Sequence, residues 1–243
     1  MSSPLTFDVV RVFTTPDGRL GNGLAIIDAS SATAGREQAL AERLGLSETV
    51  FVGDRANGVA SIRIFTPAVE LPFAGHPTVG TAWWLHSQGT PVDTLRVTAG
   101  DVRVRVDGEV IWIRAKGAWA AAFEWHVLDS ADQVAATDPA SFPDGYHYVY
   151  AWTDEPAGHV RSRMFAPAYA IAEDQATGAA AARLTWELGR DLTITQGLGS
   201  QLFTHRLDSE WVEVGGRTCF DRTVEVTDDR QPPEAKGTGS IRE

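Results

Sequence analysis

Short runs of alternating apolar and polar residues dominate this chain and predict a largely β structure. The clearest alternation runs through residues 94–115, where the Asp107–Gly108 pair marks a tight hairpin turn. A Gly215–Gly216 pair predicts a second turn, just before the last strand. Similar apolar patterns predict further strands over residues 7–13, 24–27, 46–52, 60–65, 123–128, 146–152, 160–165, 192–195, 201–206, 211–214 and 218–226.

Four segments have helical composition, and two of these begin with unusually small residues. Residues 34–44 have apolar side chains at helical spacing and stop at Gly45, and residues 130–136 predict a short helix. A third helix starts near His76, and a fourth covers residues 179–188. The fourth has only Gly and Ala in its first turn, and the third follows Gly75 and continues with the small residues Thr78, Gly80, Thr81 and Ala82.

One motif occurs twice in the chain, at a spacing of 100 residues. In each copy a strand runs into a proline-containing turn and then into one of the small-residue helices. Two copies are too few for a solenoid, so we expect two similar halves that face each other. The matched pairs are Arg63 and Arg163, Phe65 and Phe165, Pro67 and Pro167, Ala68 and Ala168, and Ala82 and Ala182.

The repeat predicts an α+β protein in which each half is a mixed, curved sheet or barrel around a central helix. We place the halves at residues 1–115 and 116–226, with the last strand a candidate member of the first half's sheet. Residues 227–243 contain almost no apolar side chains, so we expect this tail to be disordered.

Composition narrows the function classes. The 243 residues carry a formal net charge of −11 with no cluster of Lys or Arg, which argues against nucleic acid or an acidic membrane as partner. No apolar run approaches the ~18 residues of a membrane span, and the first residues do not resemble a signal peptide. A single cysteine, Cys219, is compatible with a reducing cytoplasm and excludes an internal disulfide.

The two small-residue helix starts are candidates for an anion site. A helix N-terminus has unpaired N–H groups and a partial positive charge, so it attracts carboxylates. Residues 75–78 and 176–179 place bare backbone and a threonine hydroxyl at these ends. Tight packing would also explain the small residues. It would not explain the polar residues at both junctions, which are Glu70, His76, Glu173 and Asp174. We therefore favour a shared site for a small anionic substrate.

Several ordered motifs resemble the phenazine-biosynthesis-like PhzF family. They are Ser47-Glu-Thr-Val-Phe-Val52, Phe65-Thr-Pro67, Glu70-Leu-Pro-Phe-Ala-Gly-His-Pro-Thr-Val-Gly80, Phe165-Ala-Pro167 and Glu173-Asp-Gln-Ala-Thr-Gly-Ala-Ala-Ala181. The resemblance extends from about residue 7 to residue 226. It implies the diaminopimelate-epimerase-like fold, with the active site in the cleft between two halves, usually in a homodimer. It also implies a cytoplasmic biosynthetic isomerase that moves a proton on carbon without a cofactor or metal.

The resemblance assigns site residues by position. Glu48 falls where the family has its catalytic glutamate, and a carboxyl in a partly apolar cleft has its pKa raised enough to give and take a proton. His76 and Asp174 fall on the family's other two polar active-site positions and would orient the substrate and assist the proton transfer. Residues expected to bind the substrate are Gly75, Pro77, Thr78, Thr177, Gly178, Ala179, Gln196 and Gly197.

Two departures from the family pattern leave other functions open. Gln175 replaces a proline, and Ala179 replaces a serine that would offer the substrate a hydroxyl. These changes favour a small carboxylate other than the phenazine precursor. The alternatives are an epimerase or racemase that uses one carboxylate, and a binding protein without activity. The helix starts contain no cysteine, which argues against the two-thiol racemases of the same fold.

Overall fold

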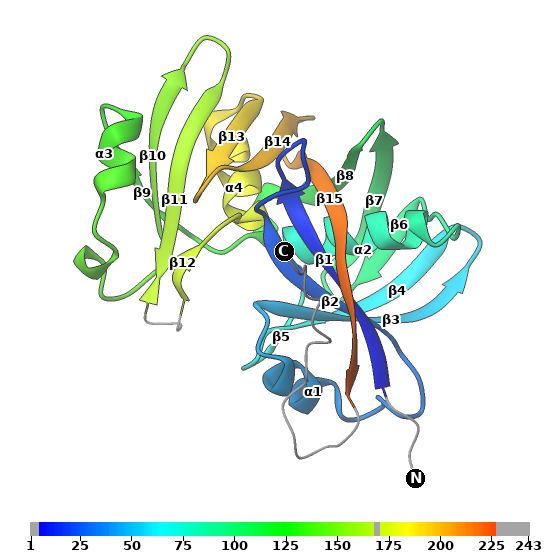
Figure 1. Cartoon of the computed structure of the whole chain (residues 1–243). Helices are drawn as coiled ribbons and strands as arrows, with labels where there is room; N and C mark the ends of the chain where they lie inside the picture. Colours follow the sequence, from blue (N-terminus) through cyan, green and yellow to red (C-terminus); the bar gives the residue numbers. More distant parts are fainter. Residues whose placement is uncertain (1–4, 168–170, 227–243) are drawn as a thin grey trace, which may run out of the picture.

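The computed structural model describes residues 5–167 and 171–226 of the chain. The predicted disorder of residues 227–243 lies outside these ranges. None of the helices they contain is long and apolar enough to cross a membrane. The described residues form one continuous sheet that curves around two central helices, as Figure 1 shows.

The first half is a closed barrel in the described part of the chain. Its strands follow one another around the barrel, and antiparallel pairing of the first with the last closes it. Helix α1 (Glu37–Leu44) and the two-residue strand β5 (Glu70–Leu71) are attached to it. In order, the barrel strands are β1 (Leu5–Thr14), β2 (Asn22–Asp28), β3 (Glu48–Ala56), β4 (Val59–Phe65), β6 (Thr94–Val97), β7 (Gly100–Asp107), β8 (Val110–Lys116) and β15 (Trp211–Val226).

Helix α2 (Gly75–Ser87) lies inside this barrel and packs against β1, β2, β3, β8 and β15 (Figure 1). A helix enclosed on all sides needs small residues wherever a strand comes close. A Cβ built on Gly80 would lie 2.6 Å from a methyl of Val12 and 2.7 Å from a methyl of Leu24. Packing therefore explains this glycine without any functional role.

The second half is a curved sheet around α4 (Gly178–Leu188), which packs against β14 and β15. From β15 the sheet continues in the order β14, β13, β11, β10 and β9, and β12 pairs with β11. Its elements are η1 (Gly117–Trp119), β9 (Glu124–Val127), α3 (Ala131–Ala136), η2 (Pro139–Ser141), β10 (His147–Asp154), β11 (His159–Ala166), β12 (Ile171–Asp174), β13 (Leu192–Gln196) and β14 (Ser200–Arg206).

Strand pairing repeats between the halves and confirms the predicted α+β fold of two similar units. In the first unit, β2 pairs parallel with β3, β3 antiparallel with β4, and β4 parallel with β6. In the second unit, β9 pairs parallel with β10, β10 antiparallel with β11, and β11 parallel with β13. Thr49 lies opposite Phe65 in the first unit, and His147 lies opposite Phe165 in the second. The register therefore makes Thr49 and His147 structural equivalents.

The predicted turn at Gly215–Gly216 is wrong, because β15 runs unbroken from Trp211 to Val226. The two glycines are required by neighbouring rings. A Cβ on Gly215 would lie 2.5 Å from the Trp112 ring, and one on Gly216 would lie 2.3 Å from the Phe13 ring. The strand pairs with β8 over its first part and with β1 over its last, so one strand joins both halves of the sheet.

Candidate active site

The two central helices begin against each other. A Cβ built on Gly75, the first residue of α2, would lie 3.0 Å from the Cα of Gly178, the first residue of α4. Neither helix has a side-chain cap hydrogen bond at this end. Because helix N-termini are positively polarised, two of them placed together attract a negatively charged group more strongly than one does.

Glu48 and His76 face each other beside this junction. Glu48 is the first residue of β3, and His76 is the second residue of α2. The Glu48 Oε2 atom lies 3.4 Å from the His76 Nε2 atom, and the two side chains are 17% and 5% exposed. Neither atom has a hydrogen-bond partner in the described residues. A buried polar atom without a partner is costly in a folded protein, so this pair is a strong candidate for ligand contact.

Burial raises the pKa of the Glu48 carboxyl above its ordinary value. The nearby Asp174 carboxylate raises this pKa further, while His76 and a hydrogen bond from Ser47 act in the opposite direction. A carboxyl whose pKa lies closer to neutrality can both accept and release a proton at physiological pH, as a general acid–base group must.

Asp174 is held rigidly next to the start of α4. It ends β12, and its Oδ2 accepts a hydrogen bond from the hydroxyl of Thr177 at 2.6 Å. Its Oδ1 accepts one from the side-chain amide of Asn22, which also donates to the Ala176 carbonyl at 2.9 Å. Asn22 belongs to the first half of the chain, so this contact joins the two halves at the site.

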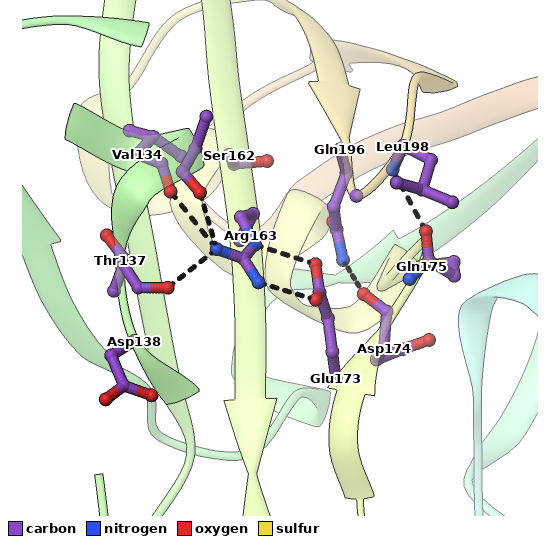
Figure 2. Close-up of polar contacts among 12 residues, drawn as sticks. Val134, Thr137, Asp138, Ser162, Arg163, Glu173, Asp174, Gln175, Gln196 and Leu198 are labelled. Carbon is purple, nitrogen blue, oxygen red and sulfur yellow. Dashed lines mark hydrogen bonds and ion pairs between the residues drawn. The ribbon is translucent and has the colours of Figure 1, made fainter. Parts of the chain in front are cut away.

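Gln196 is fully buried, and hydrogen bonds occupy its side-chain amide completely. Its Oε1 accepts from the Tyr148 hydroxyl and the Thr177 N–H, both at 3.2 Å. Its Nε2 donates to the Thr177 hydroxyl at 2.7 Å and to the Asp174 carbonyl at 2.8 Å, a contact drawn in Figure 2. These bonds place Gln196 at the base of the β12–α4 turn, where it holds Thr177 and Asp174, and its predicted contact with substrate stays a prediction.

The remaining predicted substrate-binding residues gather at the same junction in different ways. Pro77 and Thr78 are buried in the first turn of α2, and the Thr78 hydroxyl donates to the Ala74 carbonyl at 2.7 Å. Ala179 is the second residue of α4. Gly197 packs against Gln175, whose Oε1 accepts the Leu198 N–H at 2.9 Å (Figure 2). The departure from the family pattern at Gln175 therefore ties the β13–β14 turn to the start of α4.

Glu70 and Glu173, which the sequence offered as support for an anion site, are engaged elsewhere. Glu70 forms a two-bonded ion pair with Arg63, at 2.9 and 2.7 Å. Glu173 forms the same pair with Arg163, at 2.9 and 2.8 Å, and Figure 2 shows it beside Asp174. These repeated pairs brace the two turns, so the helix starts remain the support for the predicted anion site.

The motifs also contained residues whose role the sequence did not reveal. Asn22 follows Gly21 in the chain, and nothing in the sequence placed it beside Asp174. Tyr148 is one of several alternating aromatic residues and gave no sign that its hydroxyl meets Ser162 and Gln196. Both contacts connect segments far apart in the chain, and periodicity cannot report such contacts.

Comparison with known proteins gives a consistent result. Residues 10–114 match the model of the PhzC-PhzF family, described as phenazine biosynthesis-like protein. The chain is 33% identical over 218 residues to the trans-2,3-dihydro-3-hydroxyanthranilate isomerase of Pseudomonas aeruginosa, covering 73% of this chain and 77% of that protein. It is 32% identical to the enzyme of the same name from Pseudomonas chlororaphis, covering 90% and 91%.

Solved structures agree on the fold. A PhzF-family phenazine biosynthesis protein from Bacillus anthracis superposes with a TM-score of 0.78 at 19% identity, over 93% of this chain and 100% of that one. A hydroxyproline epimerase from Agrobacterium vitis superposes with a TM-score of 0.62 at 12% identity, over 92% of both chains. At these identities the likeness concerns the fold alone.

Proposed function

The chain belongs to the PhzC-PhzF family of phenazine biosynthesis-like proteins, and we propose that it is an isomerase that moves a proton on a small, carboxylate-bearing substrate without a cofactor. The observation that carries this proposal is that the buried atoms Glu48 Oε2 and His76 Nε2 face each other at the junction of the two helix starts, neither with a hydrogen-bond partner in the described residues. Two relatives that the chain largely covers are named as isomerases, which supports the reaction class.

In the proposed reaction, the substrate's carboxylate lies against the N–H groups at the starts of α2 and α4. Glu48, as the carboxylate, takes a proton from one carbon of the substrate, and the electron pair of that C–H bond shifts into the adjacent π-system. The protonated Glu48 then returns the proton to another carbon, so a double bond changes place and the overall composition is unchanged. The raised pKa of Glu48 supports both steps.

His76 and Asp174 have supporting roles in this scheme. His76, at 3.4 Å from Glu48, holds the substrate's polar group on one side of the carboxyl. Asp174 is kept in place by Asn22 and Thr177, and its negative charge helps to raise the pKa of Glu48. A thiol mechanism is disfavoured, because Cys219 lies on β15 opposite Arg11 and burial raises its pKa.

The test is turnover in deuterated water, starting with the relatives' substrate, trans-2,3-dihydro-3-hydroxyanthranilate, and continuing with other small unsaturated carboxylates. Glu48→Gln should abolish isomerisation and leave binding, measured by calorimetry, within about tenfold of wild type. His76→Asn and Asp174→Asn should lower kcat by about 10² or more. A Glu48→Gln variant that still isomerises the substrate would contradict the proposal.

The position of the incorporated deuterium separates the alternatives. Deuterium at the carbon that receives the proton, in a product whose double bond has moved, supports the isomerase, whereas deuterium at an inverted stereocentre identifies a one-carboxylate epimerase or racemase. Binding in wild type with neither exchange nor an isomerised or inverted product identifies a binding protein. The homodimer and the cytoplasmic location stay predictions, and light scattering of the purified protein tests the first.

A further inference from the structure

A second cluster of chemically active side chains lies in the outer part of the second half. Glu124 and His126 are two positions apart on β9, and His147 begins the adjacent parallel strand β10. Residues two apart on a strand share a face, so all three point to one side of the sheet. Each offers a donor atom, and these atoms lie within 4.8 Å of one another. The proposed reaction uses none of these residues.

The hydrogen bond at the far side of His147 determines what its ring presents to the cluster. His147 Nε2 contacts the carbonyl oxygen of Asp144, which can only accept, so this nitrogen carries the hydrogen. The Nδ1 atom of the neutral ring then has a free lone pair. The same arrangement orients metal-binding histidines, whose second nitrogen commonly donates to a backbone carbonyl. His147 is 5% exposed, so its ring is also held by packing.

Two other electron-rich atoms face this lone pair. His147 Nδ1 lies 3.1 Å from His126 Nε2 and 3.6 Å from Glu124 Oε2. Two ligand atoms on one tetrahedral zinc ion stand about 3.3 Å apart, given bond lengths of about 2.0 Å. These two separations lie on either side of this value, and all three donor atoms lie within 4.8 Å of one another. A lone pair and a carboxylate this close are stabilised by a cation between them.

The corresponding positions of the first half show that the fold does not require this cluster. By strand register, Glu124, His126 and His147 correspond to Ala25, Ile27 and Thr49, all almost completely buried. The first half therefore fills the same place with ordinary packing. The second half instead has an exposed carboxylate and two imidazoles at the strand that ends its sheet order.

We propose that Glu124, His126 and His147 bind one divalent transition-metal ion, with zinc the best match. Two imidazoles and one carboxylate are a donor set that zinc accepts, and a fourth position is left for water. Glu124 is 64% exposed, so the ion can enter from solvent. The ion ties β9 to the start of β10 and to the turn at Asp144–Gly145. Gly145 leaves room for the Glu124 carboxylate, since a Cβ at this position would lie 3.0 Å from Glu124 Oε1.

A hydrogen bond between the two imidazoles is the competing explanation of their 3.1 Å separation. In that arrangement His126 Nε2 donates to His147 Nδ1, and Glu124 plays no part. The two explanations differ in whether Glu124 matters and in whether added metal binds at all.

The test uses the full chain without an affinity tag, stripped of metal by a chelator and titrated with Zn²⁺ by calorimetry and with Co²⁺ by absorption spectroscopy. We expect one equivalent to bind, with the visible bands of tetrahedral Co²⁺, and the thermal midpoint to rise with Zn²⁺. Glu124→Gln and His126→Phe should each weaken binding by about tenfold or more. His205→Ala removes an exposed histidine next to Asp191 and should bind as wild type does.

Two results would overturn the proposal. One is the absence of stoichiometric binding in wild type, which would leave the imidazole hydrogen bond as the explanation. The other is equal affinity in wild type, Glu124→Gln and His126→Phe, which would place the ion elsewhere. Glu124 is exposed, so loss of folding cannot mimic the effect of its replacement.

Discussion

Gly75 and Gly178 bring the two halves of the molecule into backbone contact, because a Cβ on either residue would lie 3.0–3.1 Å from the Cα of the other. The contact joins the first residues of α2 and α4. It sets the spacing of the two helix starts, and with it the position of His76 relative to Asp174. The stability of the whole chain and the geometry of its candidate site therefore depend on the same pair of glycines.

Replacing either glycine with alanine should destabilise the protein. Both neighbours are backbone atoms that cannot rotate away, so Gly75→Ala or Gly178→Ala should lower the free energy of unfolding by about 1–3 kcal/mol. Urea denaturation measures this. Gly23→Ala is the control, since its Cβ would meet only the Leu46 side chain at 3.7 Å. Equal effects at Gly23 and Gly75 would contradict a special role for the helix contact.

Glu48 should reduce stability at neutral pH. Burial raises the pKa of the Glu48 carboxyl in the folded state above its value in the unfolded state. The protonated carboxyl therefore favours the folded state below the unfolded-state pKa, and this contribution is lost as pH rises through the folded-state pKa. The free energy of unfolding of Glu48→Gln relative to wild type should therefore increase with pH across that window, by about 1.4 kcal/mol per unit of pKa shift.

Urea denaturation between pH 4.5 and 8 measures this difference. Glu42→Gln, which replaces an exposed glutamate of α1, is the matched control and should show no such trend. A Glu48→Gln difference that stays level over this range would mean that the carboxyl is not desolvated.

Asn22 should be essential for holding the Asp174 carboxylate. Asn22→Asp would put a second carboxylate where an amide now donates to Asp174, so at pH 8 it should lower stability by about 2 kcal/mol or more. The loss should shrink toward pH 5, as one of the two carboxyls takes up a proton. Thermal melting at both pH values checks this, with Asn57→Asp in an exposed turn as control. A loss independent of pH would argue for a purely steric effect.

The two matching arginine–glutamate pairs should differ in strength. Arg163 is 14% exposed and also donates to the Thr137 and Ala135 carbonyls at the end of α3, whereas Arg63 is 50% exposed. Lysine cannot reproduce these multiple contacts. Arg163→Lys should lower the free energy of unfolding by about 2 kcal/mol, and Arg63→Lys by less than about 1 kcal/mol.

Urea denaturation of the two lysine variants side by side tests this difference. Each serves as the control for the other, because both occupy the same place in the repeated motif. The reverse order of the two effects would mean that burial does not govern these pairs.

Local pattern was sufficient for much of the fold. The alternation over residues 94–115 predicted β6, β7 and β8, and the repeated motif predicted two similar halves around small-residue helices. Local pattern failed at Gly215–Gly216, because a glycine pair is typical both of a turn and of close packing against an aromatic ring. Only the position of Trp112 and Phe13 decides between these readings.

The sequence by itself determined most of the strands, the two small-residue helices that lie inside the sheet, and that Glu48, His76 and Asp174 belong to motifs shared with one family. Side-chain periodicity and backbone propensity act over a few residues, so these features are written locally. The tertiary structure alone decided that Gly75 meets Gly178, that Asn22 reaches Asp174, and that three donors converge at β9, where no metal site was expected. Such contacts depend on strand register and packing between distant segments.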